Sequence, residues 1–307
     1  MNVLITGGNG FLGSNVVKKL IKENHNVLVI SKNNNNIKSI TDKCKFICCY
    51  IDEIEIHIND IESFSPDIVL LFGWHGANSY KDIHHIDQYH KNVPHYIKFI
   101  ESINKFKTKP KIIGVGSFIE YGNYSIPITE EFFERPNSLY GLSKFTFKQY
   151  SEMLCKQNDI NWGWIRPCYT YGPNDVSTRL IPNLINKLLK NEKIHLNECN
   201  TTLDYLYIDD FVNFVYSLIL SNEHGVYNIC SGNQYKLKDI INTLYRLTNS
   251  KSEIIFDKNL NRKDNSNFLC GDNTKIKKLS NIYKLLDIEE GLTRTIEFYE
   301  RQNYIKR

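Results

Sequence analysis

The stretch TGGNGFLG, residues 6–13, decides the fold because it joins an apolar run to an amphipathic one. Residues Val3–Thr6 form a short apolar run, which is typical of a buried strand. Residues Gly13–Glu23 repeat apolar side chains at helical spacing, and this predicts a helix with one buried face. A strand, a glycine-rich turn and a helix in this order predict the first unit of a parallel sheet with crossover helices.

Three of the four glycines in this stretch have separate tasks. Gly7 permits a tight turn, Gly10 lets backbone amides approach a pyrophosphate, and Gly13 lets the helix pack closely on the strand. The N-terminus of the helix then faces the anion, which its partial positive charge favours. The spacing therefore predicts a dinucleotide-binding turn.

The rest of the first half repeats this alternation of apolar runs and amphipathic stretches. Further strands are predicted at Asn26–Ile30, Lys45–Cys49, Asp67–Phe72, Lys111–Val115 and Asn161–Ile165. Helices are predicted from about Ile86 to Phe106, from near Leu139 through Lys156, and near Leu180–Lys190, Asp209–Ser221 and Leu237–Leu247. We therefore expect an α/β chain. A doubly wound parallel sheet covers residues 1–165 and is rejoined by about residues 204–222, and a smaller α/β cap covers residues 166–307.

The composition excludes several classes of protein. Lys and Arg total 38 against 34 acids, and this surplus of +4 is too small and scattered to predict a nucleic-acid or membrane surface. No apolar run is long enough to span a membrane, and the N-terminus lacks a signal segment. The eight cysteines show no Cys-x-x-Cys pair and no zinc-ligand spacing. We expect reduced thiols, no metal site and a cytoplasmic location.

The end of the second predicted strand bears on the choice of cofactor. A carboxylate at this position holds the adenosine ribose hydroxyls of NAD. Here the strand ends Val29-Ile30-Ser31-Lys32, without an acid. A hydroxyl and a cation suit a 2′-phosphate, which a carboxylate would repel. The sequence therefore favours NADP(H), and NAD(H) stays open because Lys32 is also explained as a solvated loop residue.

A tyrosine and a lysine stand one helical turn apart in the helix predicted from Leu139. Tyr140 and Lys144 therefore lie on one face of that helix. A nearby ammonium lowers the pKa of a phenol, so Tyr140 is expected to exchange a proton with a carbonyl or alcohol near neutral pH. Ser117 comes just past the strand Lys111–Val115, at the edge where open α/β sheets bind ligands. Ser117, Tyr140 and Lys144 form a candidate catalytic group.

Taken in order, these motifs resemble the extended short-chain dehydrogenase/reductase family, and within it the nucleotide-sugar epimerases, dehydratases and ketoreductases. The resemblance covers nearly the whole chain. Its further landmarks are Asn92-Val93, Tyr121-Gly122, Arg166-Pro167, Tyr171-Gly172-Pro173, Arg179-Leu-Ile-Pro182, Asp204-Tyr-Leu-Tyr-Ile-Asp209-Asp210, Gly225-Val-Tyr227-Asn228-Ile-Cys-Ser231-Gly232 and Glu290-Gly291-Leu292. It implies a Rossmann-type doubly wound parallel sheet with a smaller C-terminal substrate-binding α/β cap.

The resemblance also implies roles for individual residues. Tyr140 would be the general acid/base, Ser117 would hydrogen-bond the same substrate oxygen, and Lys144 would hold the nicotinamide ribose. The residues implied at the cofactor are Gly7, Gly10, Phe11, Leu12, Gly13, Ser31, Lys32, Phe72, Gly73, Trp74, Asn92, Tyr140, Lys144 and Cys168. Those implied at the sugar nucleotide are Trp74, His75, Ser117, Tyr169, Arg179 and Arg262, with the two arginines at its diphosphate.

Departures from the family pattern select among its reactions. A 4,6-dehydratase carries an Asp-Glu pair where this chain has Phe118 and Ile119, and bifunctional 3,5-epimerase/reductases carry a cysteine at the second of these positions. A 4-epimerase generally keeps the carboxylate that Ser31 replaces, whereas Trp74 resembles an aromatic residue of 4-keto-6-deoxyhexose reductases. We therefore interpret the chain as an NADPH-dependent reductase of a nucleotide-diphosphate-linked 4-keto(-6-deoxy) sugar, with Tyr140 as proton donor.

Two alternative functions stay open. The first is a nucleotide-sugar 4-epimerase with tightly bound NAD. The second is a non-catalytic dinucleotide-binding sensor, which would be expected to lose Ser117, Tyr140 or Lys144.

The resemblance also implies an oligomeric state. The helices that contain Asn92 and Tyr140 commonly pair across a two-fold axis in this family, which predicts a homodimer with a four-helix interface. The apolar side chains expected there are Ile97, Phe99, Ile100, Phe145, Phe147 and Met153.

Overall fold

A seven-stranded parallel sheet is the centre of the computed structural model, which describes residues 1–35, 42–76, 82–260 and 268–305. Its strands, in spatial order, are β11 (Gly225–Ile229), β6 (Trp162–Pro167), β5 (Lys111–Val115), β4 (Ile68–Leu71), β1 (Asn2–Thr6), β2 (Asn26–Ser31) and β3 (Lys45–Cys48). From β1 the chain builds outward to β2 and β3, and then crosses back to β4 on the other side. The strand order therefore reverses between β1 and β4, and such a switch point is where ligands bind in open α/β sheets.

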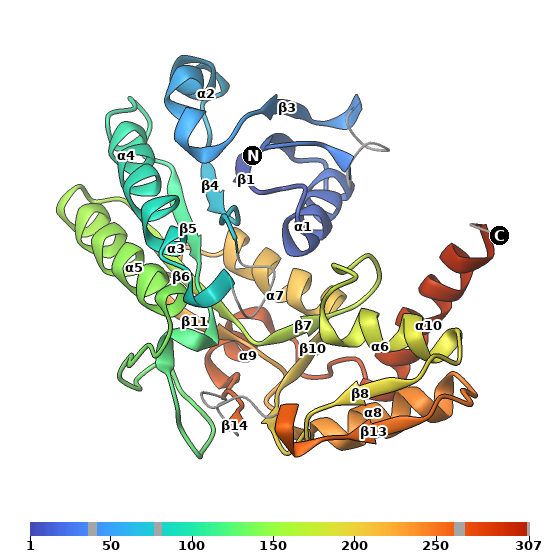
Figure 1. Cartoon of the computed structure of the whole chain (residues 1–307). Coiled ribbons are helices and arrows are strands. Elements are labelled where there is room, and N and C mark those ends of the chain that lie inside the picture. The colour runs from blue at the N-terminus through green and yellow to red at the C-terminus, as the bar shows by residue number, and fades with distance from the viewer. Residues whose placement is uncertain (36–41, 77–81, 261–267, 306–307) are drawn as a thin grey trace.

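Helices cover both faces of this sheet, as the continuous apolar runs of its strands require. α1 (Phe11–Lys22) and α7 (Ile208–Leu220) pack together on one face, and α4 (Val93–Asn104) and α5 (Leu139–Gln157) pack together on the other (Figure 1). Val3 and Ile5 of β1 join the core beneath α1, whereas Leu4 joins the core beneath α4. This arrangement is a Rossmann-type, doubly wound α/β fold, as the sequence predicts.

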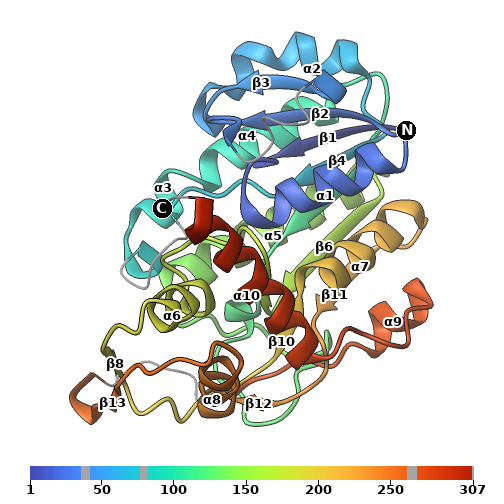
Figure 2. The same ribbon diagram turned by 90° about the vertical axis from the view of Figure 1, so that its right-hand side faces the viewer.

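A smaller lobe follows β6 (Figure 2). Its short strands pair as β7 (Tyr169–Tyr171) with β10 (Tyr205–Tyr207), β8 (Ile194–Leu196) with β13 (Ile254–Phe256), and β9 (Thr202–Leu203) with β12 (Tyr235–Lys236) and β14 (Phe268–Leu269). The helices α6 (Leu180–Leu189), α8 (Leu237–Leu247) and α10 (Ile288–Ile305) pack on one another, and α10 also contacts β10. Their apolar faces share one core with α1 and α7, so the two parts of the chain are packed as a unit.

The chain returns to the large sheet through β11, and the sequence prediction of a return within residues 204–222 is wrong. β10 pairs in parallel with β7, outside the large sheet, and α7 packs against α1. β11 then adds to the sheet beside β6. An apolar run predicts a strand without naming its partner, because the partner depends on which strand edge lies alongside it in space.

The single helix predicted over residues 86–106 is interrupted. α3 (Asp87–His90) ends before Asn92, and α4 starts after it with Pro94 in its first turn. Proline has no backbone N–H to donate, so it fits the first turn of a helix and not the interior. Asn92 instead bonds the backbone N–H and C=O of His75 with its side chain. The interruption thereby anchors the loop that follows β4.

Three side chains predicted at a subunit interface lie inside the molecule. Phe99 and Ile100 of α4 and Phe147 of α5 are buried in the core beneath these helices. They cannot contact a partner, whereas Met153 is exposed. The sheet covers the more apolar face of each helix, and helical periodicity alone does not show which apolar residues that face includes.

Two general expectations concern membranes and thiols. Throughout the described ranges, every helix is too short or too polar to cross a membrane. The eight cysteines all lie in those ranges and form no disulfide. Cys49 is buried as a core residue, whereas Cys48, beside it at the end of β3, is exposed.

A buried group of charges joins β5, β6 and α5. Arg166 on β6 and Glu120 in the short turn η4 (Phe118–Tyr121) are fully buried, and Arg166 Nε donates a hydrogen bond of 2.8 Å to Glu120 Oε2. Arg166 Nη2 donates to Glu134 over 2.6 Å, and Lys148 Nζ of α5 lies 3.2 Å from the same carboxylate. Buried charges are tolerated when they are paired and hydrogen-bonded. Each of these buried charges therefore depends on the others for the pairing that makes its burial tolerable.

Removal of Arg166 should destabilise the protein strongly. We expect Arg166→Met to lower the free energy of unfolding by about 3–5 kcal/mol, because Glu120 is left buried without its cation. The matched control is Arg246→Met, which breaks a pair with Glu289 whose side chains are 60% and 50% exposed. That variant should lose less than about 1 kcal/mol. Urea unfolding measures the free energy of unfolding of both variants. Equal losses would show that the buried pair contributes no more to stability than the exposed one.

Candidate active site

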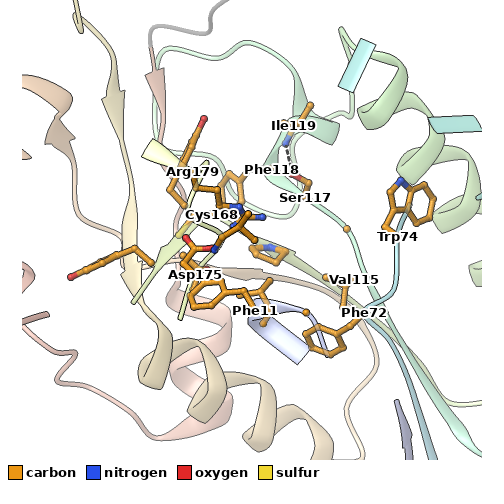
Figure 3. Close-up of a pocket in the computed structure, with 18 of the residues that line it drawn as sticks. Phe11, Phe72, Trp74, Val115, Ser117, Phe118, Ile119, Cys168, Asp175 and Arg179 are labelled. Carbon is orange, nitrogen blue, oxygen red and sulfur yellow. Dashed lines mark hydrogen bonds and ion pairs between the residues drawn. The ribbon is translucent and has the colours of Figure 1, made fainter. Parts of the chain in front are cut away.

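A cavity of about 430 Å³ lies where the large sheet meets the smaller lobe. Its walls come from the turn after β1, the loop after β4, the end of β5 with η4, α5, the β6–β7 connection and the start of α6 (Figure 3). Most of these segments follow the carboxyl ends of parallel strands, which is where sheets of this class bind ligands. The volume is in the range of small-molecule sites.

The glycine-rich turn after β1 forms one wall of the cavity. Gly7 has a φ of +67°, and a Cβ atom there would lie 2.5 Å from the backbone of Gly73. A Cβ atom on Gly13 would lie 2.4 Å from the carbonyl oxygen of Gly7. α1 begins at Phe11 with no side-chain cap and no acid in its first turn. The first N–H groups of the helix are therefore left for an anion in the cavity.

The end of β2 lies next to this turn. Gly7 N–H donates a hydrogen bond of 2.7 Å to the carbonyl of Ile30. Beyond it, Asn33 accepts a hydrogen bond from the side chain of Asn9, so the loop after β2 is tied to the glycine turn. Ser31 and the exposed Lys32 stand at this junction. No carboxylate occupies the end of β2.

The structure brings the three predicted catalytic side chains together. Ser117 follows β5 and caps η4, and Tyr140 and Lys144 lie one turn apart on α5. Tyr140 and Ser117 both line the cavity, and the Ser117 side chain lies close enough to Tyr140 to lower its pKa. Lys144 Nζ donates to the carbonyl of Val115 over 2.7 Å. A substrate oxygen that reaches Tyr140 would therefore also meet the Ser117 hydroxyl.

Burial controls the protonation of this group. Burial raises the pKa of Tyr140 to about 12, and the negative charge of Glu120 acts in the same direction, whereas Arg179 and the Ser117 side chain oppose the rise. Burial also lowers the pKa of Lys144 to about 7, against the opposing effect of Glu120. In the chain alone the pKa of Tyr140 is therefore raised, because burial outweighs the groups that lower it, and the effect of Lys144 on this pKa stays a prediction. At neutral pH Tyr140 is a protonated phenol, which is the form of a proton donor.

Glu120 is a functional residue whose role the sequence did not reveal. Its Oε1 atom accepts the backbone N–H of Ser117 over 2.7 Å, and its other oxygen binds Arg166. Its carboxylate is buried in this network and does not line the cavity. Glu120 therefore fixes Ser117 and does not take part in proton exchange with a substrate.

Asp175 is a cavity residue that the sequence analysis missed. Its side chain is 3% exposed, its Oδ1 accepts the N–H of Val176 over 2.7 Å, and Oδ1 lies 3.7 Å from Arg179 Nη1. Burial raises the pKa of Asp175 to about 6, and Arg179 opposes the rise. Asp175 and Arg179 lie at the end of the cavity away from Trp74 (Figure 3). The only sequence feature that pointed to Asp175 was its position two residues after Pro173. One sequence does not show that this carboxylate faces the cavity.

The remaining predicted residues divide into two sets. The cavity lining includes Gly7, Gly10, Phe11, Leu12, Gly13, Phe72, Trp74, Ser117, Tyr140, Lys144, Cys168, Tyr169 and Arg179. Ser31, Lys32, Gly73, His75 and Asn92 lie outside this lining, and Arg262 lies outside the described residues. The Cys168 thiol donates to Asp204, and burial raises its pKa well above the ordinary value, so it is not a nucleophile. Within the described ranges, His, Cys, Asp and Glu side chains form no group of three that would hold a metal ion.

The buried ammonium of Lys144 should cost stability. We expect Lys144→Met to raise the free energy of unfolding by about 1–2 kcal/mol near neutral pH, because a site built for chemistry holds a buried charge that an apolar side chain replaces. Unfolded lysine keeps its proton up to about pH 10, whereas folded Lys144 releases it near pH 7. The unfolded state binds more protons in this window, so wild-type stability rises with pH. The gain from Lys144→Met should therefore shrink toward pH 10.

Lys148 is the matched control for this measurement. It lies one turn further along α5, is also buried, and pairs with Glu134 at 3.2 Å and Glu152 at 3.1 Å. Lys148→Met removes a paired ammonium and should lower the free energy of unfolding. If urea unfolding shows the same loss for both variants, the Lys144 ammonium is compensated in the folded state.

Comparisons with known proteins identify the family of this chain. Residues 3–230 match the model of the NAD dependent epimerase/dehydratase family. The chain is 25% identical to the dTDP-6-deoxy-L-talose 4-dehydrogenase (NAD(+)) of Aggregatibacter actinomycetemcomitans, over 78% of this chain and 88% of that protein. It is 30% identical to the dTDP-D-glucose 4,6-dehydratase of Dictyostelium discoideum, over 78% of this chain and 59% of that protein.

A solved structure shows the same fold over the whole length. The UDP-glucose 4-epimerase of Thermotoga maritima superposes with a TM-score of 0.91 at 24% identity, covering 99% of this chain and 100% of that one. These relatives carry names of three different reactions, so likeness alone does not select among them. The family match spans well over half of the chain, from β1 through β11. The chain belongs to the NAD dependent epimerase/dehydratase family.

Proposed function

We propose that the protein reduces a nucleotide-diphosphate-linked 4-keto(-6-deoxy) sugar to the 4-hydroxy sugar, with NADPH as reductant. The observation that carries this proposal is the placement of Tyr140. Its phenol lies in the cavity that Ser117 and the glycine turn also line, and with its raised pKa it is protonated at neutral pH. Reduction of a ketone needs a proton donor at the carbonyl oxygen, whereas oxidation of an alcohol needs the phenolate first.

The cavity has the features that a nicotinamide dinucleotide requires. Gly7 and Gly13 let the turn pack closely on its neighbouring backbone, and the first turn of α1 has no acid to repel a pyrophosphate. Phe11, Leu12 and Phe72 line the same wall. When bound, the reduced dinucleotide supplies a hydride to the carbonyl carbon. Lys144 would hold its ribose hydroxyls.

The side chains of this protein supply the proton and orient the oxygen. Tyr140 Oη donates its proton to the carbonyl oxygen of the sugar as that oxygen becomes an alcohol. The Ser117 hydroxyl donates a hydrogen bond to the same oxygen and stabilises the negative charge that develops there. Lys144, fixed to the Val115 carbonyl, stabilises the phenolate that Tyr140 becomes. Water then returns a proton to Tyr140.

A dehydratase needs further groups to remove water from the sugar. The two positions after Ser117 hold Phe118, which is buried, and Ile119, which lines the cavity. Neither side chain exchanges protons. Glu120, the next residue, is occupied by Arg166 and the Ser117 N–H. These observations favour simple reduction over elimination.

The other end of the cavity suits the charged part of the substrate. Arg179 lies there with its side chain 42% exposed, and a guanidinium matches diphosphate oxygens well. Tyr169 is 47% exposed on the lining and offers a face for stacking. The relative from Aggregatibacter is named for chemistry at C4 of a dTDP-6-deoxy sugar, which supports a keto group at that carbon.

We further propose a homodimer through the solvent faces of α4 and α5.

A 4-epimerase with tightly bound NAD is the second candidate, favoured by the whole-chain likeness to the Thermotoga enzyme. Such an enzyme would copurify with its dinucleotide and interconvert sugars without consuming added NADPH. A non-catalytic sensor is disfavoured, because Ser117, Tyr140 and Lys144 are all present and assembled. An absorbance spectrum of the purified protein separates the reductase from the 4-epimerase, because the epimerase would carry bound dinucleotide.

Replacement of the Tyr140 hydroxyl should abolish turnover and leave cofactor binding intact. We expect Tyr140→Phe to lower the turnover number by about 10²–10⁴-fold, since the proton donor is lost and the ring remains. The assay follows NADPH oxidation across UDP-, dTDP-, GDP- and CDP-linked 4-keto sugars. Tyr150→Phe is the control, because Tyr150 lies on the same helix and bonds Glu101 outside the cavity. An active Tyr140→Phe enzyme would overturn the mechanism.

Cofactor preference should depend on Ser31. We expect wild-type protein to bind NADPH more tightly than NADH, and Ser31→Asp to shift this preference at least about tenfold toward NADH, because a carboxylate repels the 2′-phosphate. Asn26→Asp adds the same charge at the opposite end of β2 and should leave the preference unchanged. Calorimetric titration with both dinucleotides measures the effect. If the wild-type protein preferred NADH, the inference of NADPH specificity from Ser31 would be wrong.

A further inference from the structure

Trp74 makes a contact that neither the cofactor nor the sugar requires. The Lys144 ammonium lies over its ring, with Nζ 3.7 Å from the ring centroid. Tyr140 meets the same ring edge-on, with the two centroids 6.4 Å apart. Trp74 stands at the opposite end of the cavity from Asp175 and Arg179, with Ser117 between them (Figure 3). The indole therefore borders the catalytic group directly.

Contacts with Gln88 and Tyr96 hold the indole ring in place. Its Nε1–H donates a hydrogen bond of 2.9 Å to Gln88, a side chain that is 1% exposed. The indole also stacks on Tyr96, with the centroids 5.6 Å apart and the planes 11° apart. Tyr96 in turn donates to the carbonyl of Gly73, the residue before Trp74. Such a support fixes both the position and the tilt of the indole.

We propose that Trp74 is a positioning residue for Lys144. Its indole ring fixes the lysine side chain at the catalytic group and favours its charged form. The electron-rich face of an indole attracts an ammonium, and the attraction is strongest where water is excluded. Lys144 is 2% exposed, and its Nζ donates a hydrogen bond to the Val115 carbonyl. No acid forms an ion pair with it among the described residues, so the indole supplies the stabilisation that a carboxylate would otherwise give.

Charged and titratable groups around Lys144 also act on its pKa or on that of its neighbour Tyr140. Burial lowers the pKa of the lysine, and Glu120 of η4 raises it from a distance. Tyr140, on the same helix, has its ring centroid 5.9 Å from Nζ. Arg179 of the smaller lobe acts on Tyr140. The Trp74 ring favours the ammonium over the amine, so its removal should move the titration of Lys144 to lower pH.

Two substitutions separate the ring face from simple packing. Trp74→Phe and Trp74→Leu both lose the bond to Gln88 and both admit some water, but only Trp74→Phe keeps an aromatic face. The protein is prepared with isotope-labelled lysine, the Lys144 signal is identified by its loss in Lys144→Met, and its titration is followed by NMR without any ligand. We expect a midpoint about one pH unit lower in Trp74→Leu than in Trp74→Phe.

Dinucleotide binding gives a second readout. If the charged lysine holds the ribose, the pH at which affinity falls should move down with the NMR midpoint in Trp74→Leu. Equal midpoints in the two variants would overturn the proposal, and so would tighter dinucleotide binding by Trp74→Leu at every pH, which would mean that the indole obstructs the site. The role given to Lys144 rests on the proposed function, but the titration is made on the protein alone. Failure to reduce keto sugars would therefore leave the inference testable.

Discussion

The buried ion pair between Glu120 and Arg166 is the interaction on which the site depends. It connects the end of β5 to β6, and through Glu134 and Lys148 it reaches α5. The carboxylate that binds Arg166 also accepts the N–H of Ser117, so the backbone at this proposed catalytic residue is held by the same group. A buried carboxylate left without its cation is costly, and the segment that carries Ser117 is therefore held in one position.

Burial then sets the chemistry of the neighbouring groups. The same exclusion of water keeps Tyr140 protonated and disfavours the charge on Lys144, so the two groups need different support. A phenol that donates a proton gains from a dry site, because its neutral form is the active one. An ammonium does not, and the Trp74 ring lies where it offsets part of that penalty. The aromatic residue after β4 and the buried tyrosine thus belong to one arrangement.

Much of the site could be predicted from local sequence patterns. The glycine turn, Ser117 and the Tyr140–Lys144 pair all lie on the cavity because each follows from spacing within one strand or one helical turn. Asp175 and the structural role of Glu120 could not be predicted in this way. Whether an acid faces a cavity or a buried arginine depends on residues far away in the chain, such as Arg166, and no short-range pattern records that choice.

The sequence by itself determined most strands and helices of the Rossmann-type half and which residues are candidates for chemistry, since hydrophobic periodicity and glycine positions act within a few residues. The tertiary structure decided three other matters. It placed β11 and not β10 beside β6, it interrupted the helix before Pro94, and it set the protonation of Tyr140 and Lys144. The physical reason is the same in each case: strand pairing, the anchoring of a loop by Asn92 and the exclusion of water all arise from contacts between segments that are distant in the sequence.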